Sequence, residues 1–377
     1  MKNKIKYISF YNHVHSEFNR VSALSAVNKI NYVIDTLNEL NYNVELISPS
    51  WLTKDNNVNF IKSIKENIGR NLFVYTPSFR PTNKFFSTFN VILSIVWVTF
   101  YLIFNCKKNE KVIVYHSPLL IIPVSIVRKI KGIDVILEIE EIYHEVWPNN
   151  KQFRFFKKNE NNFLQKIKKA IVASDNIQNR LNLDDLNTIK LYGAYRVNSN
   201  KTKDNYNNNI IEVVYAGGIE KTRSGAFNSI ELMSFLPSNY RLNILGYGSE
   251  DCIDELLQKI DLYNEKLHNK IIFHGTLHGN DLNNFLHKCH IGLNPQNLGD
   301  YMDSAFPSKI LTYISNGLNV ISSDIEVIRK SKISDYIFFY QNMEDVSSFQ
   351  YKNYDYNIVK VLHMNFLNHL KLLLNAH

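Results

Sequence analysis

The sequence predicts an α/β protein of two domains, and three observations lead to this expectation. At 377 residues the chain exceeds a single ordinary core, since domains usually hold roughly 100–200 residues. Short strand-like runs alternate with stretches of helical apolar spacing along most of the chain. A polar segment at 198–209 interrupts this alternation, which then starts again. Two successive sets of βαβ units, and therefore two mainly parallel sheets, are the simplest outcome.

The first predicted domain, 1–197, holds β-branched and aromatic runs that suit buried parallel strands. The expected strands are 6–10, 44–48, 72–75, 112–115, 135–139 and 171–174, with a helix at 22–40. An uncharged stretch at 85–106 is long enough to span a bilayer. Ser87, Asn90 and Ser94 nevertheless form a polar stripe along it. A buried or interface-seated helix is therefore favoured over a spanning one.

The second predicted domain, 210–350, follows the linker at 198–209. A last helix at 351–377 carries apolar residues at helical spacing and could pack back on the first domain. The second domain repeats the alternation of the first, with strands at 212–215, 241–245, 271–273, 291–294 and 319–322 and helices near 226–235, 250–260, 281–288 and 308–315.

Charge is distributed unevenly along the chain. Residues 1–200 hold 27 Lys and Arg against 16 Asp and Glu, a balance of +11, whereas residues 201–377 hold 16 against 19, a balance of −3. A basic half attracts an anionic partner such as a membrane face, a lipid phosphate or a nucleic acid, unless its lysines are simply solvated. The basic–aromatic interleaving of single-strand binders is not evident, so no nucleic acid is expected.

The cysteines and the N-terminus favour a cytoplasmic protein. Cys106, Cys252 and Cys289 are odd in number and lack metal-ligand spacing, so neither a disulfide framework nor a zinc site is expected. The first residues, MKNKIKYISFYNHV, contain only a short apolar run without a small-residue cleavage site. A secretory signal peptide is therefore not expected.

Candidate ligand positions follow the strands of the second domain, because open parallel sheets bind ligands beyond the carboxyl ends of their strands. After the run 212–215, a loop with Gly217, Gly218, Lys221 and Arg223 precedes a helix. Glycines let a backbone approach a ligand, and the two cations could bind a diphosphate. A plain strand–turn–helix with solvated cations is the alternative.

Two further strands end in glycine. Gly246 closes the run 241–245, and His274, Gly275 and Thr276 follow 271–273. Backbone groups there could meet a base or a ribose, although histidines in loops are more often solvated.

A fourth position combines a loop with a helix start. The residues expected to contact an anion or a sugar are Asp303, Ser304, Ala305, Phe306, Pro307, Ser308, Lys309 and Thr312. Pro307 and Ser308 suit the start of a helix. Gly317 suits its carboxyl-terminal cap. The start of this helix would then point toward the ligand.

The run FPSKILTYISNGLNVISSD resembles the donor-binding motif of glycosyltransferase family 4, which comprises retaining enzymes of the GT-B fold. YAGGIEKTRSG resembles the glycine-rich diphosphate loop of that family, and LGYGSED and FHGTLHGNDL match the intervening strands in order and spacing. The resemblance is closest over 210–325 and looser over 1–195. It implies two Rossmann-like domains facing each other across a cleft, with reaction between them.

The resemblance also implies roles. Lys221 and Arg223 would neutralise the diphosphate of a nucleotide-sugar, and the amides around 305–307, with Lys309, would contact phosphate or sugar. No metal or other cofactor is expected, because protein cations stabilise the leaving group. The sequence departs from the family where two glutamates are usual, since Ser304 and Thr312 occupy those positions. Asp303, one residue away from the first of them, could substitute.

In the first domain, His116 follows the run 112–115, and Glu140 and Glu141 follow 135–139. His116 could contact acceptor or sugar, and one of the glutamates could act as a base or stabilise positive charge on the sugar ring. A structural histidine and solvated carboxylates are equally compatible with the sequence.

The predicted function is transfer of a sugar to a glycan or lipid-linked acceptor in bacterial capsule, O-antigen or exopolysaccharide biosynthesis. The protein is expected in the cytoplasm, with peripheral contact at the inner face of the cell membrane. Two alternatives remain open: a degenerate GT-B scaffold or partner protein, suggested by the missing glutamates, and a nucleotide-sugar epimerase on the same fold.

Overall fold

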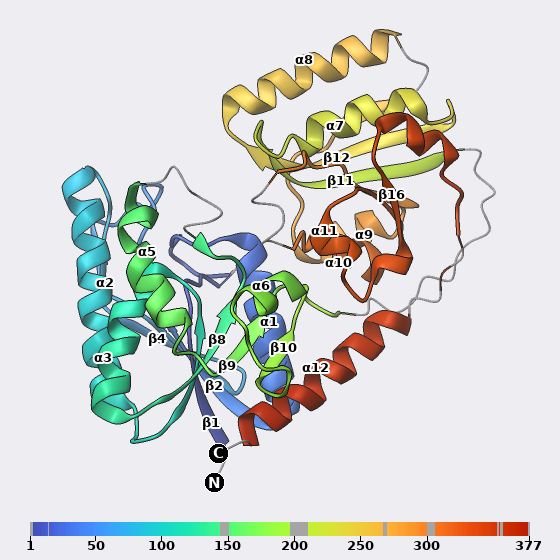
Figure 1. The fold of residues 1–377 in the computed structure, drawn as a ribbon. Helices are drawn as coiled ribbons and strands as arrows, with labels where there is room; N and C mark the ends of the chain where they lie inside the picture. Colours follow the sequence, from blue (N-terminus) through green and yellow to red (C-terminus); the bar gives the residue numbers. More distant parts are fainter. Residues whose placement is uncertain are drawn as a thin grey trace. The chain divides into compact units, whose positions relative to one another are not determined.

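The computed structural model describes residues 3–13, 15–143, 151–196, 210–266, 270–299, 306–352, 354 and 357–375. The chain divides into two compact units: residues 1–194 with 365–377 form unit 1, and residues 195–364 form unit 2. Each unit is built around a mainly parallel sheet, as the alternation in the sequence predicts (Figure 1).

Unit 1 is an eight-stranded sheet in the order β10-β9-β8-β7-β1-β2-β5-β4. The edge strand β4 is antiparallel to β5, and the other neighbours are parallel. Its strands and helices are β1 (Asn3–Ile8), α1 (Leu24–Glu39), β2 (Tyr42–Ser48), β4 (Ile64–Ile68), β5 (Asn71–Tyr75), α2 (Lys84–Asn105), β7 (Lys111–Tyr115), α3 (Ile121–Lys131), β8 (Asp134–Ile139), α5 (Lys151–Leu164), β9 (Lys169–Val172), α6 (Asp175–Arg180) and β10 (Thr188–Lys190). The short strands β3 (Phe60–Ile61) and β6 (Ser78–Phe79) pair with each other.

Strand order in unit 1 reverses direction between β1 and β7, which places the ends of these strands where parallel sheets usually bind ligands. The helices α2, α3 and α5 cover one face of the sheet, and α1 lies on the other face (Figure 1). The helix α12 (Asn357–Asn375) supplies its last residues to this unit. The ring of Phe366 lies 5.6 Å from that of Tyr32 in α1.

The helix α2 matches the uncharged stretch of the sequence. Among the described residues it is long and apolar enough to cross a membrane by length and composition. It packs against unit 1, however, through a buried stripe that contains the polar residues Asn90 and Ser94. Asn90 and Ser94 of the predicted stripe thus face the protein, whereas Ser87, its third residue, is exposed.

Unit 2 is a six-stranded parallel sheet in the order β13-β12-β11-β14-β15-β16. Numbered from the first strand of the unit, this order is 3-2-1-4-5-6, that of dinucleotide-binding sheets, with the reversal between β11 and β14. Its elements are β11 (Ile211–Ile219), α7 (Gly225–Leu232), β12 (Tyr240–Gly248), α8 (Glu250–Lys266), β13 (Ile271–Phe273), α9 (Gly279–Leu286), β14 (Ile291–Asn294), α10 (Lys309–Ser315), β15 (Asn319–Ser323), α11 (Glu326–Arg329) and β16 (Ile337–Tyr340).

Candidate functional site

The two glycines at the end of β11 lie in a strand, whereas the sequence analysis expected a loop. Gly217 and Gly218 pair with Gly246 and Tyr247 of β12, and the ladder continues to the end of both strands. The reason is close approach, because a Cβ on Gly246 would lie 2.0 Å from the carbonyl oxygen of Gly217. A Cβ on Gly218 would have nothing within 4 Å. The backbone of Gly218 is therefore open to a ligand.

Lys309, the first residue of α10, brings its amine to the same strand end. The amine lies 4.0 Å from the centroid of the Tyr215 ring, and a Cβ on Gly217 would lie 2.8 Å from it. Burial, followed by the charge of nearby Arg223, lowers the pKa of Lys309 to about 7. In the described part of the chain the amine has no hydrogen bond and no ion pair. The side chain is half-buried, and a cation in such a place without a carboxylate partner favours an anionic ligand.

The other two cations of this region differ in their surroundings. The Nε atom of Arg223 lies 3.3 Å from Glu220 Oε1. The positive charge of Arg223 contributes to the lowered pKa of Lys309. Lys221 is largely exposed, and its amine lies 2.5 Å from Glu255 Oε2 on α8. That hydrogen bond raises the pKa of Lys221. Arg223 and Lys309 are thus close enough to interact electrostatically at the end of β11, whereas Lys221 pairs with a carboxylate on α8.

The turn between β11 and α7 is fixed by Tyr215. Its hydroxyl donates to the carbonyl of Gly218 at 2.8 Å. A Cβ on Gly225 would lie 2.8 Å from the same hydroxyl, so glycine is required where α7 begins. The amide of Asn297, beyond β14, donates to the carbonyl of Arg223 at 2.9 Å. Sequence reasoning missed Tyr215 because an aromatic residue in a buried strand is indistinguishable from core.

The end of β14, across the reversal from β11, carries two buried amides that were also missed. Asn294 Nδ2 donates to Ser322 Oγ at 2.9 Å, and the hydroxyl of Ser323 donates to the carbonyl of Gln296 at 2.8 Å. Within the residues that the structure describes, the side-chain oxygens of Asn294 and Gln296 are buried without a hydrogen bond. Their position at the reversal of strand order, where parallel sheets bind ligands, could have identified these amides as site candidates.

His274, Gly275 and Thr276 connect β13 to the glycine-containing end of β12. His274 Nε2 lies 2.9 Å from Asn243 Oδ1, and burial lowers its pKa. The hydroxyl of Thr276 donates to the carbonyl of Gly246 at 3.1 Å, and the Gly246 amide donates to the carbonyl of Gly275 at 2.9 Å. With φ at 70°, Gly275 adopts a backbone conformation that favours glycine. Each of these contacts holds the strand end in place.

The loop before α10 is described only in part. Asp303, Ser304 and Ala305 lie outside the described residues. Phe306 is buried, Pro307 is half-buried, and Ser308 precedes α10 without a capping hydrogen bond from its side chain, contrary to the expected cap. The hydroxyl of Thr312 donates to the carbonyl of Ser308 at 3.5 Å.

The end of α10 matches the sequence prediction more closely. Gly317 follows the last turn with φ at 74°, so the predicted glycine cap is confirmed.

In unit 1, His116 directly follows β7 and is 1% exposed. Its Nε2 lies 2.7 Å from Glu160 Oε1 of α5, which also accepts from the amide of Tyr143. His116 Nδ1 is buried and has no hydrogen bond in the described part of the unit. The carboxylate fixes one ring nitrogen and leaves the other buried without a partner among the described residues, the arrangement of an oriented histidine.

Three glutamates lie in or just after the last residues of β8. Glu140 Oε1 lies 2.5 Å from the amine of Lys29, while Glu141 is half-buried in the following loop. Glu138, inside the strand, was not a sequence candidate, and Tyr7 donates a hydrogen bond to it. Burial, and then the charge of Glu140, raise the pKa of Glu138 to about 7. The sheet end thus holds a carboxyl group that titrates near neutrality beside an ion pair.

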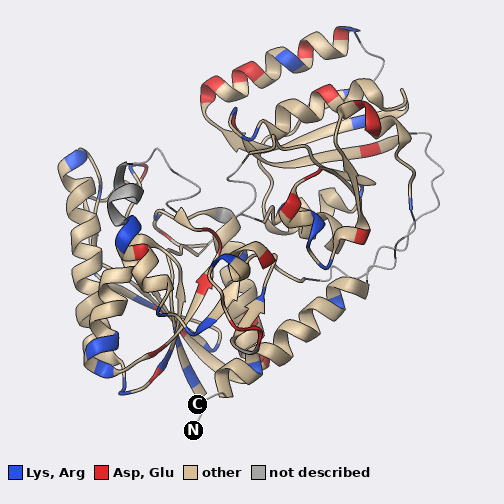
Figure 2. Cartoon of the chain, in the orientation of Figure 1, with Lys and Arg blue, Asp and Glu red and all other residues tan. Residues whose placement is uncertain are grey.

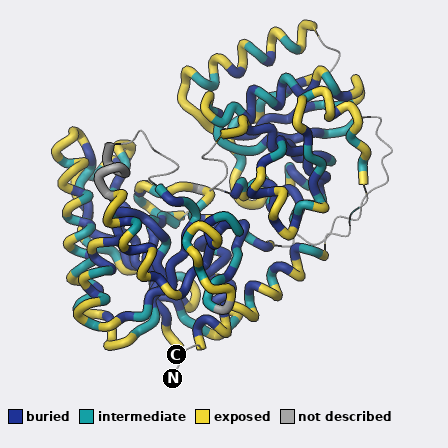
Figure 3. Tube along the Cα trace, viewed as in Figure 1, coloured by how far each residue is buried: buried dark blue, intermediate teal, exposed yellow. Residues whose placement is uncertain are grey.

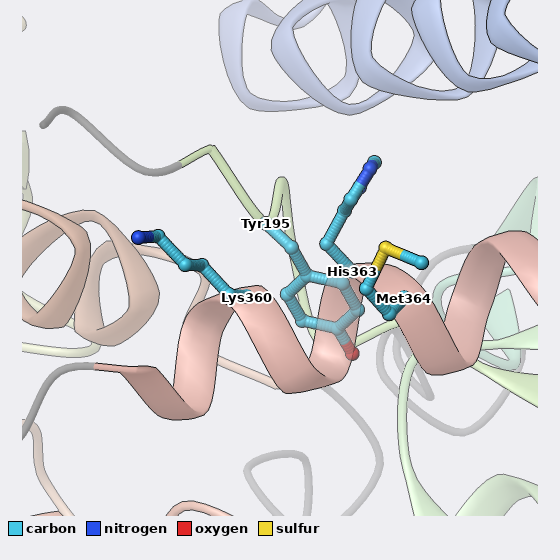
Figure 4. Close-up of a pocket in the computed structure, with 4 residues that line it drawn as sticks. All are labelled: Tyr195, Lys360, His363 and Met364. Carbon is cyan, nitrogen blue, oxygen red and sulfur yellow. The ribbon is translucent and has the colours of Figure 1, made fainter.

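A surface hollow of about 350 Å³ lies elsewhere in unit 2, lined by Tyr195, Lys360, His363 and Met364 (Figure 4). None of the predicted site residues lines it. Across the described ranges, no group of three or more His, Cys, Asp or Glu side chains could hold a metal ion.

No protein-family model matches the chain, and no curated protein matches it. Solved structures, in contrast, match over nearly its whole length. A sucrose-phosphate synthase from Thermosynechococcus elongatus superposes with a TM-score of 0.64 at 14% identity, covering 99% of this chain and 95% of that one. The UDP-forming α,α-trehalose-phosphate synthase from Burkholderia xenovorans, in complex with glucose-6-phosphate, gives 0.64 at 9% identity and covers 99% and 96%.

HepE from Anabaena, in complex with UDP and glucose, gives a TM-score of 0.58 at 10% identity, with coverage of 98% and 94%. At these identities the likeness establishes the fold alone. The chain has two Rossmann-like domains of the GT-B fold, as its sequence predicts.

Proposed function

We propose that this chain is a glycosyltransferase that uses a nucleotide-sugar. The observation that carries the proposal is the unpaired amine of Lys309 against Gly217, with Arg223 nearby, at the carboxyl end of β11. Two cations beside open backbone suit a diphosphate, the charged part of a nucleotide-sugar. Similar structures that hold UDP and glucose or are named UDP-forming support the same class of donor.

In the proposed reaction, the bond between the anomeric carbon and the diphosphate oxygen breaks, and the oxygen keeps the electron pair. Lys309 and Arg223 stabilise the charge that develops on the leaving diphosphate. The acceptor hydroxyl oxygen bonds to the anomeric carbon, and its proton passes to the released diphosphate or to a base. Retention of configuration follows from the resemblance to family 4.

The proposed roles in unit 1 rest on the strand ends beyond β7 and β8. His116, oriented by Glu160, would contact the sugar or the acceptor through its free Nδ1. Glu140 and Glu141 would supply a carboxylate near the acceptor. A glycan or lipid-linked acceptor of bacterial capsule, O-antigen or exopolysaccharide biosynthesis suits the basic first half of the chain.

A second candidate function is a degenerate transferase that serves as an assembly partner. The observation that favours it is the Thr312 hydroxyl, which bonds to the carbonyl one turn back in its own helix. The ribose contact usual in the family would then lack its carboxylate.

Thermal unfolding of the purified chain with UDP, GDP, CMP or dTDP, each with and without EDTA, tests these proposals. A ligand that binds only the native state stabilises it by about 2.7 kcal/mol at roughly a hundred times its Kd. We expect a higher melting temperature with one nucleotide, unaffected by EDTA, and transfer from its sugar derivative to a lipid-linked acceptor. If no nucleotide shifts the transition, the scaffold becomes the better account. Conversion of the nucleotide-sugar without an acceptor would instead indicate an epimerase.

A further inference from the structure

The helix α2 is fixed to unit 1 by its polar residues. Asn90 is fully buried, where it accepts from the amide of Phe79 at 2.8 Å and donates to the carbonyl of Phe79 at 2.7 Å. The hydroxyl of Ser94 lies 3.4 Å from that of Thr76. Turning the helix over would leave these buried groups unpaired, which is costly. The side of α2 that faces outward is therefore determined.

That outward side is apolar. Phe104 is 78% exposed and Phe85 71%, and the exposed residues Ile92, Val96 and Phe100 lie between them, four residues apart and therefore on one side of the helix. Figure 3 shows that much of α2 is exposed or half-buried along its length. From Phe85 to Phe104 this row extends for roughly 28 Å along the helix. Single exposed apolar residues are ordinary, but a continuous row marks an interaction surface.

The neighbouring helix α3 extends the row into a surface. It packs beside α2 on the same face of the sheet. Its exposed side carries Ile122, Ile126 and Ile130, four residues apart and therefore on one side of the helix. We call the outward sides of α2 and α3 together the α2–α3 face.

Cations border this face. Lys84 begins α2, Lys107 and Lys108 follow it, and Lys129 lies in the last turn of α3 (Figure 2). All four are exposed, and within the described residues their amines make no ion pair. Residues 81–133 contain seven Lys and Arg against one acid, a balance of +6. That acid, Glu110, is bonded to Lys6 at 2.8 Å.

We propose that the α2–α3 face docks on an anionic lipid bilayer, with α2 in the plane of the membrane surface. Phenylalanine and isoleucine side chains would enter the boundary between headgroups and acyl chains, and the bordering lysines would bind lipid phosphates. A second copy of the chain is a poorer occupant, because a two-fold contact would bring two cationic borders together. This inference goes beyond the proposed transfer reaction and does not rest on it.

Co-sedimentation with vesicles tests the proposal on the full chain. The vesicles contain phosphatidylcholine alone or with roughly a third phosphatidylglycerol. The variants are Phe100→Ser with Phe104→Ser, and Lys107→Glu with Lys108→Glu. Matched controls in unit 2 are Leu257→Ser with Leu262→Ser on α8, and Lys266→Glu at the end of α8 with Lys270→Glu just before β13, all of which change exposed residues. Unfolding of every variant is followed so that misfolding is recognised.

We expect the wild type to partition onto the anionic vesicles and less onto neutral ones, with binding that weakens as salt rises. Both variants of the α2–α3 face should bind at least about tenfold more weakly. The serine pair loses apolar contact with the acyl boundary, and each cation near an anionic surface contributes about one kcal/mol. The unit 2 controls should stay within about twofold. No binding to anionic vesicles, or equal losses in the controls, would overturn the proposal. The proposal would also be overturned if the wild type does not bind vesicles but forms a dimer, and if Phe100→Ser with Phe104→Ser dissociates that dimer.

Discussion

Near pH 7 the amine of Lys309 is divided between its charged and neutral forms, because burial and the charge of Arg223 lower its pKa to about 7. Only the charged form attracts an anion. Below about pH 7 the attraction is present, and as the pH rises above this value it is lost with the proton. A bound diphosphate would raise the pKa of the Lys309 amine, so the amine would take up a proton when the diphosphate binds.

The first prediction concerns this residue. Between about pH 7 and pH 8.5, nucleotide affinity of the wild type should fall by about tenfold. Lys309→Gln should bind weakly at both values, because the charge-assisted hydrogen bond is missing, and Lys309→Arg should retain affinity without the pH dependence. Isothermal titration with the nucleotide identified by thermal unfolding measures all three. Unaltered affinity in Lys309→Gln would remove Lys309 from the site.

Lys309 and Arg223 could be named as candidates from the sequence because both lie in motifs next to a helix start. Glu138 could not, since a carboxylate inside the run 135–139 appears only as one polar position in an apolar strand. The raised pKa and the hydrogen bond that make Glu138 a candidate depend on burial, on Glu140 and on Tyr7, which lies far from it in the sequence. Glu160 was missed for a similar reason, because its partner His116 is 44 residues away. Such roles arise from tertiary contacts that local patterns do not contain.

At the scale of elements, the glycines of β11 and β12 have two different roles. Gly246 is required for the strands to approach, whereas Gly218 faces open space. Gly246→Ala should therefore destabilise the chain by about 1–3 kcal/mol, as overpacking does. Gly218→Ala should leave the melting temperature unchanged and weaken nucleotide binding by about tenfold or more, because the added methyl group would occupy the space that we propose for the ligand.

Thermal unfolding and titration of the two variants check this prediction together. A loss of stability in Gly218→Ala, or normal nucleotide binding by a normally stable variant, would contradict the assignment of Gly218 to the site.

Elements with strong periodicity could be predicted, and those set by packing could not. Most parallel strands of both sheets fall at or near the expected ranges, but the parallel edge strands β10 and β16 were not predicted. The antiparallel edge strand β4 was missed because the three residues inside Ile64–Ile68, Lys65, Glu66 and Asn67, are all polar and resemble an exposed loop. The sequence predicted the polar stripe of α2, but its inward direction depends on the backbone of Phe79 in β6. That partner is 11 residues away and does not follow from helical spacing.

At the scale of the whole chain, charge and chemistry are divided between the two units. The excess of basic residues and the α2–α3 face belong to unit 1, and the proposed diphosphate site belongs to unit 2. A protein organised in this way could bind a lipid surface through one unit and a soluble nucleotide through the other. The two ligands should then act on separate parts of the chain.

Hydrogen exchange distinguishes this division from a single shared site. Nucleotide should slow exchange at the amides of β11, the turn before α7 and the end of β12, because ligand binding there suppresses local opening. Anionic vesicles should slow exchange in α2 and α3 instead, and the two effects should be additive when both ligands are present. The Lys309→Gln variant should lose the first effect and retain the second, while Phe100→Ser with Phe104→Ser should do the opposite. Protection of β11 by vesicles alone would show that lipid phosphate occupies the diphosphate site, so that the basic first unit is not what selects the membrane.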